Sequence, residues 1–306
     1  MSKTVAVLMG GRSAEREVSM TSGKACAAAL REAGYTVKEV IVGHDIAALI
    51  QDLTPKPDVV FNALHGRWGE DGCIQGLLEL LDLTYTHSGV MASALAIDKQ
   101  VSKHIVATAG ITSPEGRIVT PEELEQGDPM PRPYVVKPVN EGSSVGVHIV
   151  QPGDNTPVFD DELKRLGDRL LIEKFIAGRE LTVSVMGDQP LAVTEIIPKI
   201  GFYDYRAKYT DGKADHVVPA DIPASVTKDA MDAALAAHQA LGCRGVSRSD
   251  FRYDDTEKDP GDLYYLETNT QPGMTALSLV PEQAKYLGMS FPDLCAWMVE
   301  HATCDS

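Results

Sequence analysis

The sequence predicts an α/β fold that begins with an open parallel sheet. Short strand-like runs, the first of them continuously apolar as in a strand covered on both faces, lie at residues 4–9, 36–42 and 58–64. An Ala-rich segment after the first run predicts a helix capped by Ser19 and ended by Gly34. Strand and helix therefore alternate. The turn after the first strand lacks GxGxxG, so we do not expect a dinucleotide site there.

Length, charge and cysteine content limit the classes of function. The 306 residues suffice for about two or three domains. The net charge of −16, from 44 acidic and 28 basic residues, disfavours binding to nucleic acid or to an anionic membrane surface. No apolar run approaches the roughly 20 residues of a membrane span, and the chain enters its first strand too early for a signal peptide. Five cysteines without a CxxC pair predict a reducing compartment, the cytoplasm, and no zinc site.

Two polar segments follow the first predicted strands. Glu15 would face the carboxyl ends of the strands, where open sheets bind ligands, although an acid in the first turn of a helix is also common. The segment His65-Gly-Arg-Trp-Gly-Glu-Asp-Gly72 is a polar, glycine-rich loop, and such loops often carry function. Residues 92–109 then predict one helix that carries Asp98 and Lys99.

A second unit begins near Pro114 and contains a candidate anion site. Residues 134–138 predict a strand that carries Lys137 at its end, and residues 140–146 predict a Gly/Ser-rich hairpin. Backbone N–H groups and hydroxyls of such a hairpin can converge on an anion, and the lysine would add charge for a phosphate. The loop differs from the strand-to-helix GxxxxGK[ST] motif. A flexible, solvent-exposed hairpin is the alternative.

Two later segments suggest a nucleotide slot and a lid. The predicted strand 170–176 breaks into a short linker followed by Glu180, which suits adenosine with the carboxylate on the ribose hydroxyls. Residues 199–220 show the period of neither a strand nor a helix. Loops of this length within a compact domain are uncommon unless they act as lids or binding loops, so we predict a lid. A helix over 228–242 follows it.

The last two predicted strands place polar side chains on one face. Arg248 and Asp250 are two residues apart in the strand 245–253, and Glu267 and Asn269 have the same spacing in the next strand, so each pair projects from one face. The short polar turn between these strands predicts an antiparallel pair. The carboxylates and the amide would then converge and offer the oxygen ligands that Mg²⁺ prefers. Taken alone, the second strand is equally consistent with a strand end that enters the Gln-Pro-Gly turn.

Several ordered motifs carry a resemblance to a known family. They are Gly10-Gly-Arg-Ser-Ala-Glu-Arg-Glu-Val-Ser19, Ala63-Leu-His-Gly66 with Gly69-Glu-Asp-Gly72, Tyr85-Thr-His-Ser-Gly-Val-Met-Ala-Ser93, Lys137-Pro138, Glu141-Gly-Ser-Ser-Val-Gly146, Phe202-Tyr-Asp-Tyr-Arg-Ala-Lys-Tyr209 and Glu267-Thr-Asn-Thr-Gln-Pro-Gly-Met274. Over essentially its whole length the chain resembles the D-alanine–D-alanine ligases of the ATP-grasp superfamily. The resemblance implies an N-terminal Rossmann-like open parallel sheet domain over residues 1–95. Two α+β ATP-grasp subdomains would cover 96–178 and 179–306, with ATP between them.

The resemblance also implies cofactors and residue roles. ATP and two Mg²⁺, replaceable by Mn²⁺, would serve the ligation of two D-alanines through a D-alanyl phosphate, for peptidoglycan precursors. Nucleotide contacts would come from Lys99, Lys137, Glu141, Gly142, Ser144, Glu173, Lys174, Ile176 and Glu180. Metal ligands would be Asp250, Glu267 and Asn269. Catalytic positions would be Glu15, Ser143, Tyr209, Arg248 and Gly273, and further substrate contacts His65, Lys208 and Ser278.

Within these roles, the implied contacts are specific. Glu15 would bind the ammonium of the first D-alanine, and Arg248 would form an oxyanion hole with the backbone N–H of Gly273. Glu15, Ser143 and Tyr209 would hydrogen-bond together and hold the lid closed.

The chain departs from the family pattern at two loop positions, and its segment Asp254–Asp262 is a few residues longer than in some relatives. Many relatives have Ser where Gln271 stands, and Trp68 interrupts a run that is usually Gly-rich. The nearest rival function is a D-alanine–D-lactate ligase, against which the Lys208-Tyr209 pair favours dipeptide formation. A non-catalytic nucleotide-binding protein is the alternative from another class, and the joint presence of the metal and phosphate residues argues against it. The family is usually dimeric, so we expect a homodimer.

Overall fold

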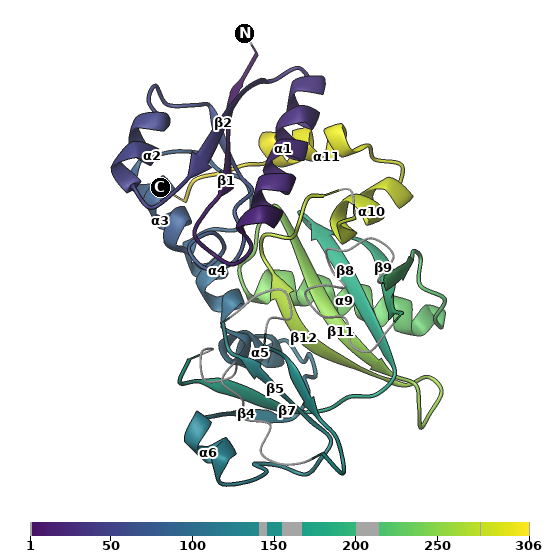
Figure 1. The fold of residues 1–306 in the computed structure, drawn as a ribbon. Coiled ribbons are helices and arrows are strands. Elements are labelled where there is room, and N and C mark those ends of the chain that lie inside the picture. Colours follow the sequence, from purple (N-terminus) through teal and green to yellow (C-terminus); the bar gives the residue numbers. More distant parts are fainter. Residues whose placement is uncertain (1, 141–145, 155–166, 200–213, 276, 306) are drawn as a thin grey trace.

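The computed structural model describes residues 2–140, 146–154, 167–199, 214–275 and 277–305. These residues form one parallel sheet and two antiparallel sheets, each accompanied by helices (Figure 1). The predicted α/β class with an open parallel N-terminal sheet is confirmed. In the described segments, no helix has the length and apolar character needed to cross a bilayer.

The N-terminal sheet has the strand order β2-β1-β3, and both pairings are parallel. Its elements are β1 (Thr4–Gly10), α1 (Arg16–Glu32), β2 (Thr36–Val42), α2 (Ile46–Asp52), β3 (Val59–Asn62) and α3 (Cys73–Leu80). Alternate residues of β1 enter two different cores: Val7 packs in the core that contains α1, and Leu8 packs in the core that contains α2 and α3. This double coverage explains the continuous apolar run.

Ser19 does not cap α1, contrary to the prediction. The helix begins earlier, at Arg16, and the Ser19 hydroxyl has another use. Ser19 Oγ accepts the Gly10 N–H at 2.9 Å and donates to the Ala63 carbonyl at 2.7 Å. It therefore joins the end of β1 to the residue that follows β3. Gly34 ends the helical segment as predicted, with φ +94°.

The single helix predicted over 92–109 is in fact two helices, α4 (Val90–Ile97) and α5 (Lys99–Thr108). Asp98 separates them because its backbone is extended. Its Oδ1 accepts the N–H groups of Gln100 and Val101 at 3.1 and 3.0 Å, which caps α5. Lys99 therefore occupies the first position of a new helix.

An antiparallel sheet with the order β4-β7-β5-β6 follows. Its elements are β4 (Gly116–Val119), the short helix α6 (Pro121–Glu125), β5 (Tyr134–Pro138), β6 (His148–Val150) and β7 (Leu170–Lys174). The predicted strand ending in Lys137 is β5, and the strand predicted before the adenosine slot is β7.

The third sheet is antiparallel, with the order β10-β9-β8-β11-β12. Its elements are β8 (Arg179–Met186), β9 (Gln189–Pro198), β10 (Ala214–Val217), α9 (Ala224–Ala240), β11 (Val246–Asp254) and β12 (Asp262–Asn269), followed by α10 (Leu279–Tyr286) and α11 (Phe291–Glu300). The prediction of an irregular lid over all of 199–220 is wrong in part. Ala214 pairs with Pro198 of β9, so the end of that range extends the sheet; residues 200–213 lie outside the described part.

The C-terminal end of the chain returns to the N-terminal sheet. Cys295 and Met298 of α11 share a buried core with Cys26 and Leu30 of α1. Beyond α11, Thr303 bridges to Tyr85 beside β3.

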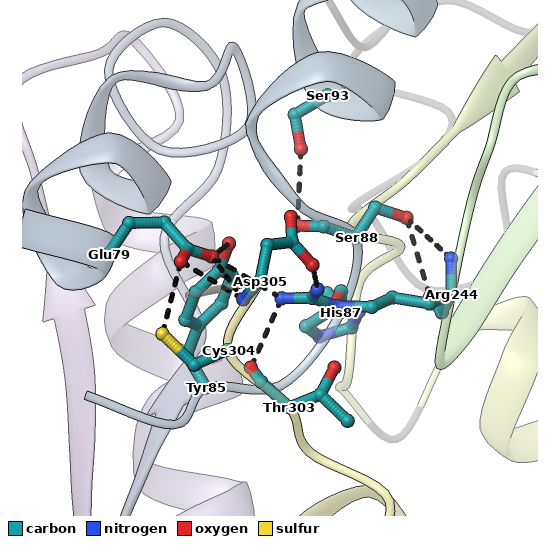
Figure 2. A network of polar contacts seen from close by, with 9 residues as sticks. All are labelled: Glu79, Tyr85, His87, Ser88, Ser93, Arg244, Thr303, Cys304 and Asp305. Carbon is teal, nitrogen blue, oxygen red and sulfur yellow. Dashed lines mark hydrogen bonds and ion pairs between the residues drawn. The ribbon is translucent and has the colours of Figure 1, made fainter. Parts of the chain in front are cut away.

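Arg244, just before β11, joins these regions (Figure 2). Its guanidinium lies 4.8 Å from the ring centre of Tyr85 and donates to the carbonyls of His87 and Thr303 at 3.2 and 3.1 Å. It also pairs with Asp305 and lies 3.8 Å from Glu79, whose carboxylate accepts the Tyr85 hydroxyl at 2.6 Å. One side chain thus connects α3, the segment before α4, the start of β11 and the C-terminal tail.

We expect Arg244→Met to lower the free energy of unfolding by about 2–3 kcal/mol, somewhat below the cost of breaking a fully buried pair. The control is Arg31→Met, whose ion pair with Glu39 has both side chains well exposed (49% and 37%). That variant should lose less than about 1 kcal/mol. Urea denaturation of both variants measures the difference. Equal losses would show that the Arg244 contacts stabilise the fold no more than an exposed ion pair does.

Candidate active site

The pairing of β11 with β12 assembles the polar residues that the sequence placed on two strands. Arg248 lies opposite Asn269 and Asp250 lies opposite Glu267. Residues directly opposite in an antiparallel pair share a sheet face, so all four side chains project from the same face. The predicted antiparallel pairing is confirmed.

A bulge next to these residues was not predicted. The register shifts between Asp250 and Phe251, so that Phe251 pairs with Tyr265 and Leu266 is the additional residue. As a result, Leu266 and Glu267 both line the same cavity, while Tyr265 is fully buried in the core on the other face. The bulge directs Glu267 toward the cavity without exposing Tyr265.

Asp250 is held in a fixed orientation. Its two oxygens accept from Arg248 Nε and Nη2, each at 2.8 Å, and Oδ1 also accepts from Thr182 Oγ1 at 2.6 Å. Two parallel N–H···O bonds of this kind fix both planar groups. The Asn269 side-chain oxygen accepts the Gln271 N–H at 2.7 Å. These bonds orient the guanidinium of Arg248 and the oxygens of Asp250 and Asn269 on the sheet face that also carries Glu267.

The cavity has a volume of about 520 Å³ and lies between the four-stranded and five-stranded sheets. We call it the main cavity. The predicted site residues that line it are Lys99, Lys137, Glu173, Lys174, Ile176, Glu180, Asp250 and Glu267. Apolar walls include Val135, Ile149 and Phe175. Apolar walls combined with several charged groups suit a ligand with a flat ring and an anionic tail.

Two ion pairs organise the lysines. Lys99 Nζ lies 3.2 Å from Glu267 Oε2, and Lys137 Nζ lies 2.6 Å from Glu173 Oε2. Glu173 also contacts Lys103, which the sequence analysis did not single out. Burial opposes the charged form of Glu173, but the two ammonium groups lower its pKa below the usual value. The side chain of Glu173 therefore belongs to the lysine cluster rather than to an apolar wall.

Glu15 and His65 approach the same region from the N-terminal sheet. Both are buried, and a Cβ on Gly66 would lie 2.7 Å from Glu15 Oε2. His65 Nε2 lies 3.3 Å from Ser22 Oγ. Burial lowers the pKa of His65 although Glu15 favours its charged form.

Glu70 is a second site residue that the sequence analysis missed. It is buried, and within the described part of the chain its Oε2 has no hydrogen-bond partner. Burial, reinforced by the charge of Glu15, raises its pKa well above the usual value. Glu70 stands in the quoted Gly69-Glu-Asp-Gly72 motif, so its position was visible although no role was assigned to it.

Gly273 and Ser278 lie close together after β12. Ser278 precedes α10, and its Oγ accepts the Thr275 N–H at 2.9 Å. A Cβ on Gly273 would lie 3.0 Å from Ser278 Oγ, tighter than ordinary contact. The remaining predicted site residues, Glu141, Gly142, Ser143, Ser144, Lys208 and Tyr209, lie outside the described residues.

The two positions that depart from the family pattern have distinct surroundings. Gln271 is buried, and its side chain accepts from Asn62 Nδ2 at 2.6 Å and donates to the Leu64 carbonyl. Trp68 has φ +74° and is 40% exposed, with the guanidinium carbons of Arg12 and Arg67 5.2 and 4.8 Å from its ring centre. Of these two residues, Gln271 is the one that also bonds to a predicted site residue, since its N–H donates to Asn269 at the end of β12.

A cavity between two antiparallel sheets, lined by several lysines and by the carboxylates of two paired strands, is typical of the ATP-grasp class of enzymes. The family profile described as "D-ala D-ala ligase C-terminus" matches residues 107–300, and that described as "D-ala D-ala ligase N-terminus" matches residues 43–88. The chain belongs to the D-alanine–D-alanine ligase family.

Individual relatives agree over nearly full length. A D-alanine–D-alanine ligase of Acidiphilium cryptum is 59% identical, with 99% of each chain covered, and one of Granulibacter bethesdensis is 56% identical, covering 99% of this chain and 98% of the relative. Among solved structures, the ligase of Bacillus anthracis is 33% identical with a TM-score of 0.81, covering 98% of this chain and 97% of that one. The same enzyme complexed with ATP gives a TM-score of 0.79 at 32% identity and the same coverage.

Proposed function

We propose that this chain joins two molecules of D-alanine into D-alanyl-D-alanine at the expense of ATP, with a D-alanyl phosphate as intermediate. The observation that carries the proposal is the shared sheet face of Arg248, Asp250, Glu267 and Asn269, of which Asp250 and Glu267 line the main cavity. Relatives that share more than half of the sequence carry the name of this activity. The product would serve peptidoglycan precursor synthesis in the cytoplasm, and the active form would be a homodimer.

ATP would occupy the main cavity. Lys99 and Lys137 would contact the phosphates, and Glu141, Gly142 and Ser144 would close over them. Glu173, Lys174 and Ile176 would border the adenine, with Glu180 on the ribose. For Glu173 the carboxylate stays with the lysines, so its adenine contact would come from the backbone of β7.

The donor set fits the two Mg²⁺ ions of the proposed reaction. Asp250, Glu267 and Asn269 would hold these ions, because their side chains offer oxygen atoms from adjacent strands and hard cations prefer oxygen ligands. Mn²⁺ would fit the same ligands. When bound, the ions neutralise the charge that develops on the phosphates.

The amino-acid half of the site would lie next to the main cavity. Glu15 would hold the ammonium of the first D-alanine, with His65 beside it, and Lys208 and Ser278 would hold the carboxylate of the second. Glu15, Ser143 and Tyr209 would link the lid to the N-terminal sheet.

Two successive displacements make up the reaction. A carboxylate oxygen of the first D-alanine attacks the γ-phosphorus, and the bond to the ADP oxygen breaks. The amine of the second D-alanine then attacks the acyl carbon, loses a proton and displaces phosphate. Arg248 and the Gly273 N–H would donate to the oxyanion of the tetrahedral intermediate, and Arg248 is already oriented by its two bonds to Asp250. A closed lid would keep water from the acyl phosphate.

We expect Glu267→Gln to reduce turnover by about 10²- to 10³-fold or more while the protein stays folded, because one preorganised charge is lost without a change of shape. Coupled ADP release measures turnover, and thermal unfolding checks the fold. Glu300→Gln is the matched control, because that carboxylate pairs with Lys3 on the surface and should leave activity unchanged. Near-normal turnover of the Glu267 variant would remove it from the metal site.

We expect Gly66→Ala to raise KM for the first D-alanine by about tenfold, with KM for ATP unchanged, because the new methyl group displaces the Glu15 carboxylate and with it one charge-assisted hydrogen bond. Gly242→Ala is the control for backbone strain, since Gly242 has nearly the same φ (+69° against +67°) and nothing within 4 Å of a Cβ. Initial rates with varied D-alanine and ATP separate the two constants. Equal changes in both variants would contradict the placement of Glu15.

The second candidate, a D-alanine–D-lactate ligase, is tested by phosphate release from ATP with D-alanine, D-lactate or both. We expect D-alanine alone to support full turnover at neutral pH and D-lactate to add little. Dominant ester formation at neutral pH would overturn the dipeptide assignment.

A further inference from the structure

Lys103 is a buried cation to which the proposed function gives no task. It lies on α5 one turn after Lys99, and its side chain is 7% exposed. Its ammonium contacts Glu173 Oε1. Among the described residues, Lys103 is not one of those that line the main cavity.

Glu173 separates Lys103 from Lys137. The register of β5 with β7 places Val135 opposite Glu173 and Lys137 opposite Leu171, so Glu173 and Lys137 are diagonal neighbours on one sheet face. Glu173 Oε2 lies 2.6 Å from Lys137 Nζ, and only 3% of the Glu173 side chain is exposed. The lysine assigned to the phosphates is therefore bound to a buried carboxylate.

The charge balance of this cluster depends on Lys103. Two ammonium groups and one carboxylate leave one net positive charge at the main cavity. If Lys103 were neutral, Lys137 and Glu173 would form a neutral pair. A buried carboxylate would then hold Lys137 strongly, because leaving that carboxylate without a cation is costly.

We propose that Lys103 is a positioning residue: it compensates the charge of Glu173, so that Lys137 is available to the phosphates of a nucleoside triphosphate. This inference rests on the proposed function, in particular on the assignment of Lys137 to the phosphates. It explains why a lysine outside the cavity is buried beside one that lines it.

The test is Lys103→Met, which keeps most of the side-chain volume and removes the charge. KM for ATP and the Kd of Mg²⁺-ADP, the latter measured by calorimetry, should rise about tenfold. This is the lower end of the loss expected when a residue that orients a binding side chain is removed. KM for D-alanine should change less than about twofold, because a specific effect on the nucleotide leaves the rest of the protein intact. Lys103→Arg should restore most of the ATP affinity, because it restores the positive charge. Arg169→Met is the control for loss of a positive charge near α5, since Arg169 pairs with Asp98 at the surface, and it should leave both constants unchanged.

A double-mutant comparison isolates the route through Glu173. Adding Lys103→Met to Glu173→Gln should change the Kd of Mg²⁺-ADP by less than about threefold, because the carboxylate that Lys103 compensates is already neutral. The comparison of Glu173→Gln with the double variant still tests the proposal if Lys103→Met alone fails to fold. A tenfold further loss in the double variant, or an unchanged KM for ATP in folded Lys103→Met, would overturn the inference.

Lys137→Met separates this inference from the proposed function. If it leaves the Kd of Mg²⁺-ADP unchanged, the phosphate assignment of Lys137 fails, and the inference fails with it. If Lys137→Met weakens binding while Lys103→Met does not, the proposed function stands and only the role of Lys103 is wrong.

Discussion

The register between β11 and β12 is the constraint on which the site depends. Because side chains alternate between the two faces of a strand, a shift of one residue would send Glu267 and Asn269 to the core and leave Asp250 and Arg248 without them. Phe251 and Tyr265, both fully buried, prevent such a shift by packing edge to face with ring centres 6.0 Å apart. The bulge at Leu266 then allows core packing on one side of the sheet and the polar site on the other. Apolar packing thus fixes the position of the charges.

Charge is distributed unevenly in this acidic protein. The net charge is −16, yet the main cavity gathers Lys99, Lys137 and Lys174, with Lys103 behind them. Three of these lysines are buried, which is costly unless each has a carboxylate partner. Glu173 and Glu267 supply those partners. Each buried lysine of the cluster is thus held in an ion pair, and Glu173 is shared between two of them.

The sequence predicted most elements and the convergence of the site, because these follow from periodicity and from turn residues. Three features depended on contacts that periodicity does not encode. Ser19 has the residue type of a helix cap, but the helix already begins at Arg16. The Ser19 hydroxyl instead joins the end of β1 to the residue after β3. Asp98 interrupts an otherwise helical pattern through its extended backbone. The strand β10 has no sequence signal of its own and is recognisable only through its pairing with β9.

Lys103 and Glu70 were not predicted from the sequence, and the reason is the same for both. Lys103 follows Lys99 at helical spacing and has the pattern of a solvated face, and its partner Glu173 is 70 residues away in the sequence. Glu70 stands in a loop where an acid is unremarkable until its burial beside Glu15 is known. In both cases the electrostatic environment of a charged side chain depends on its burial, which is a property of the fold. Residue type and spacing predict where charges lie along the chain, but not which of them lose contact with water.

Gln271 shows how the two halves of the site stay in register. Its backbone N–H donates to the Asn269 side chain, and its own side chain reaches Asn62 and the Leu64 carbonyl at the end of β3. Leu64 precedes His65, and Gln271 precedes the Pro-Gly that carries the Gly273 N–H. One buried amide, with both its donor and its acceptor in use, therefore links the segment of Asn269 and Gly273 to the segment that leads to His65. A serine at this position has one hydroxyl close to the backbone and could not reach both partners, so the Gln271 side chain is needed for both of these contacts.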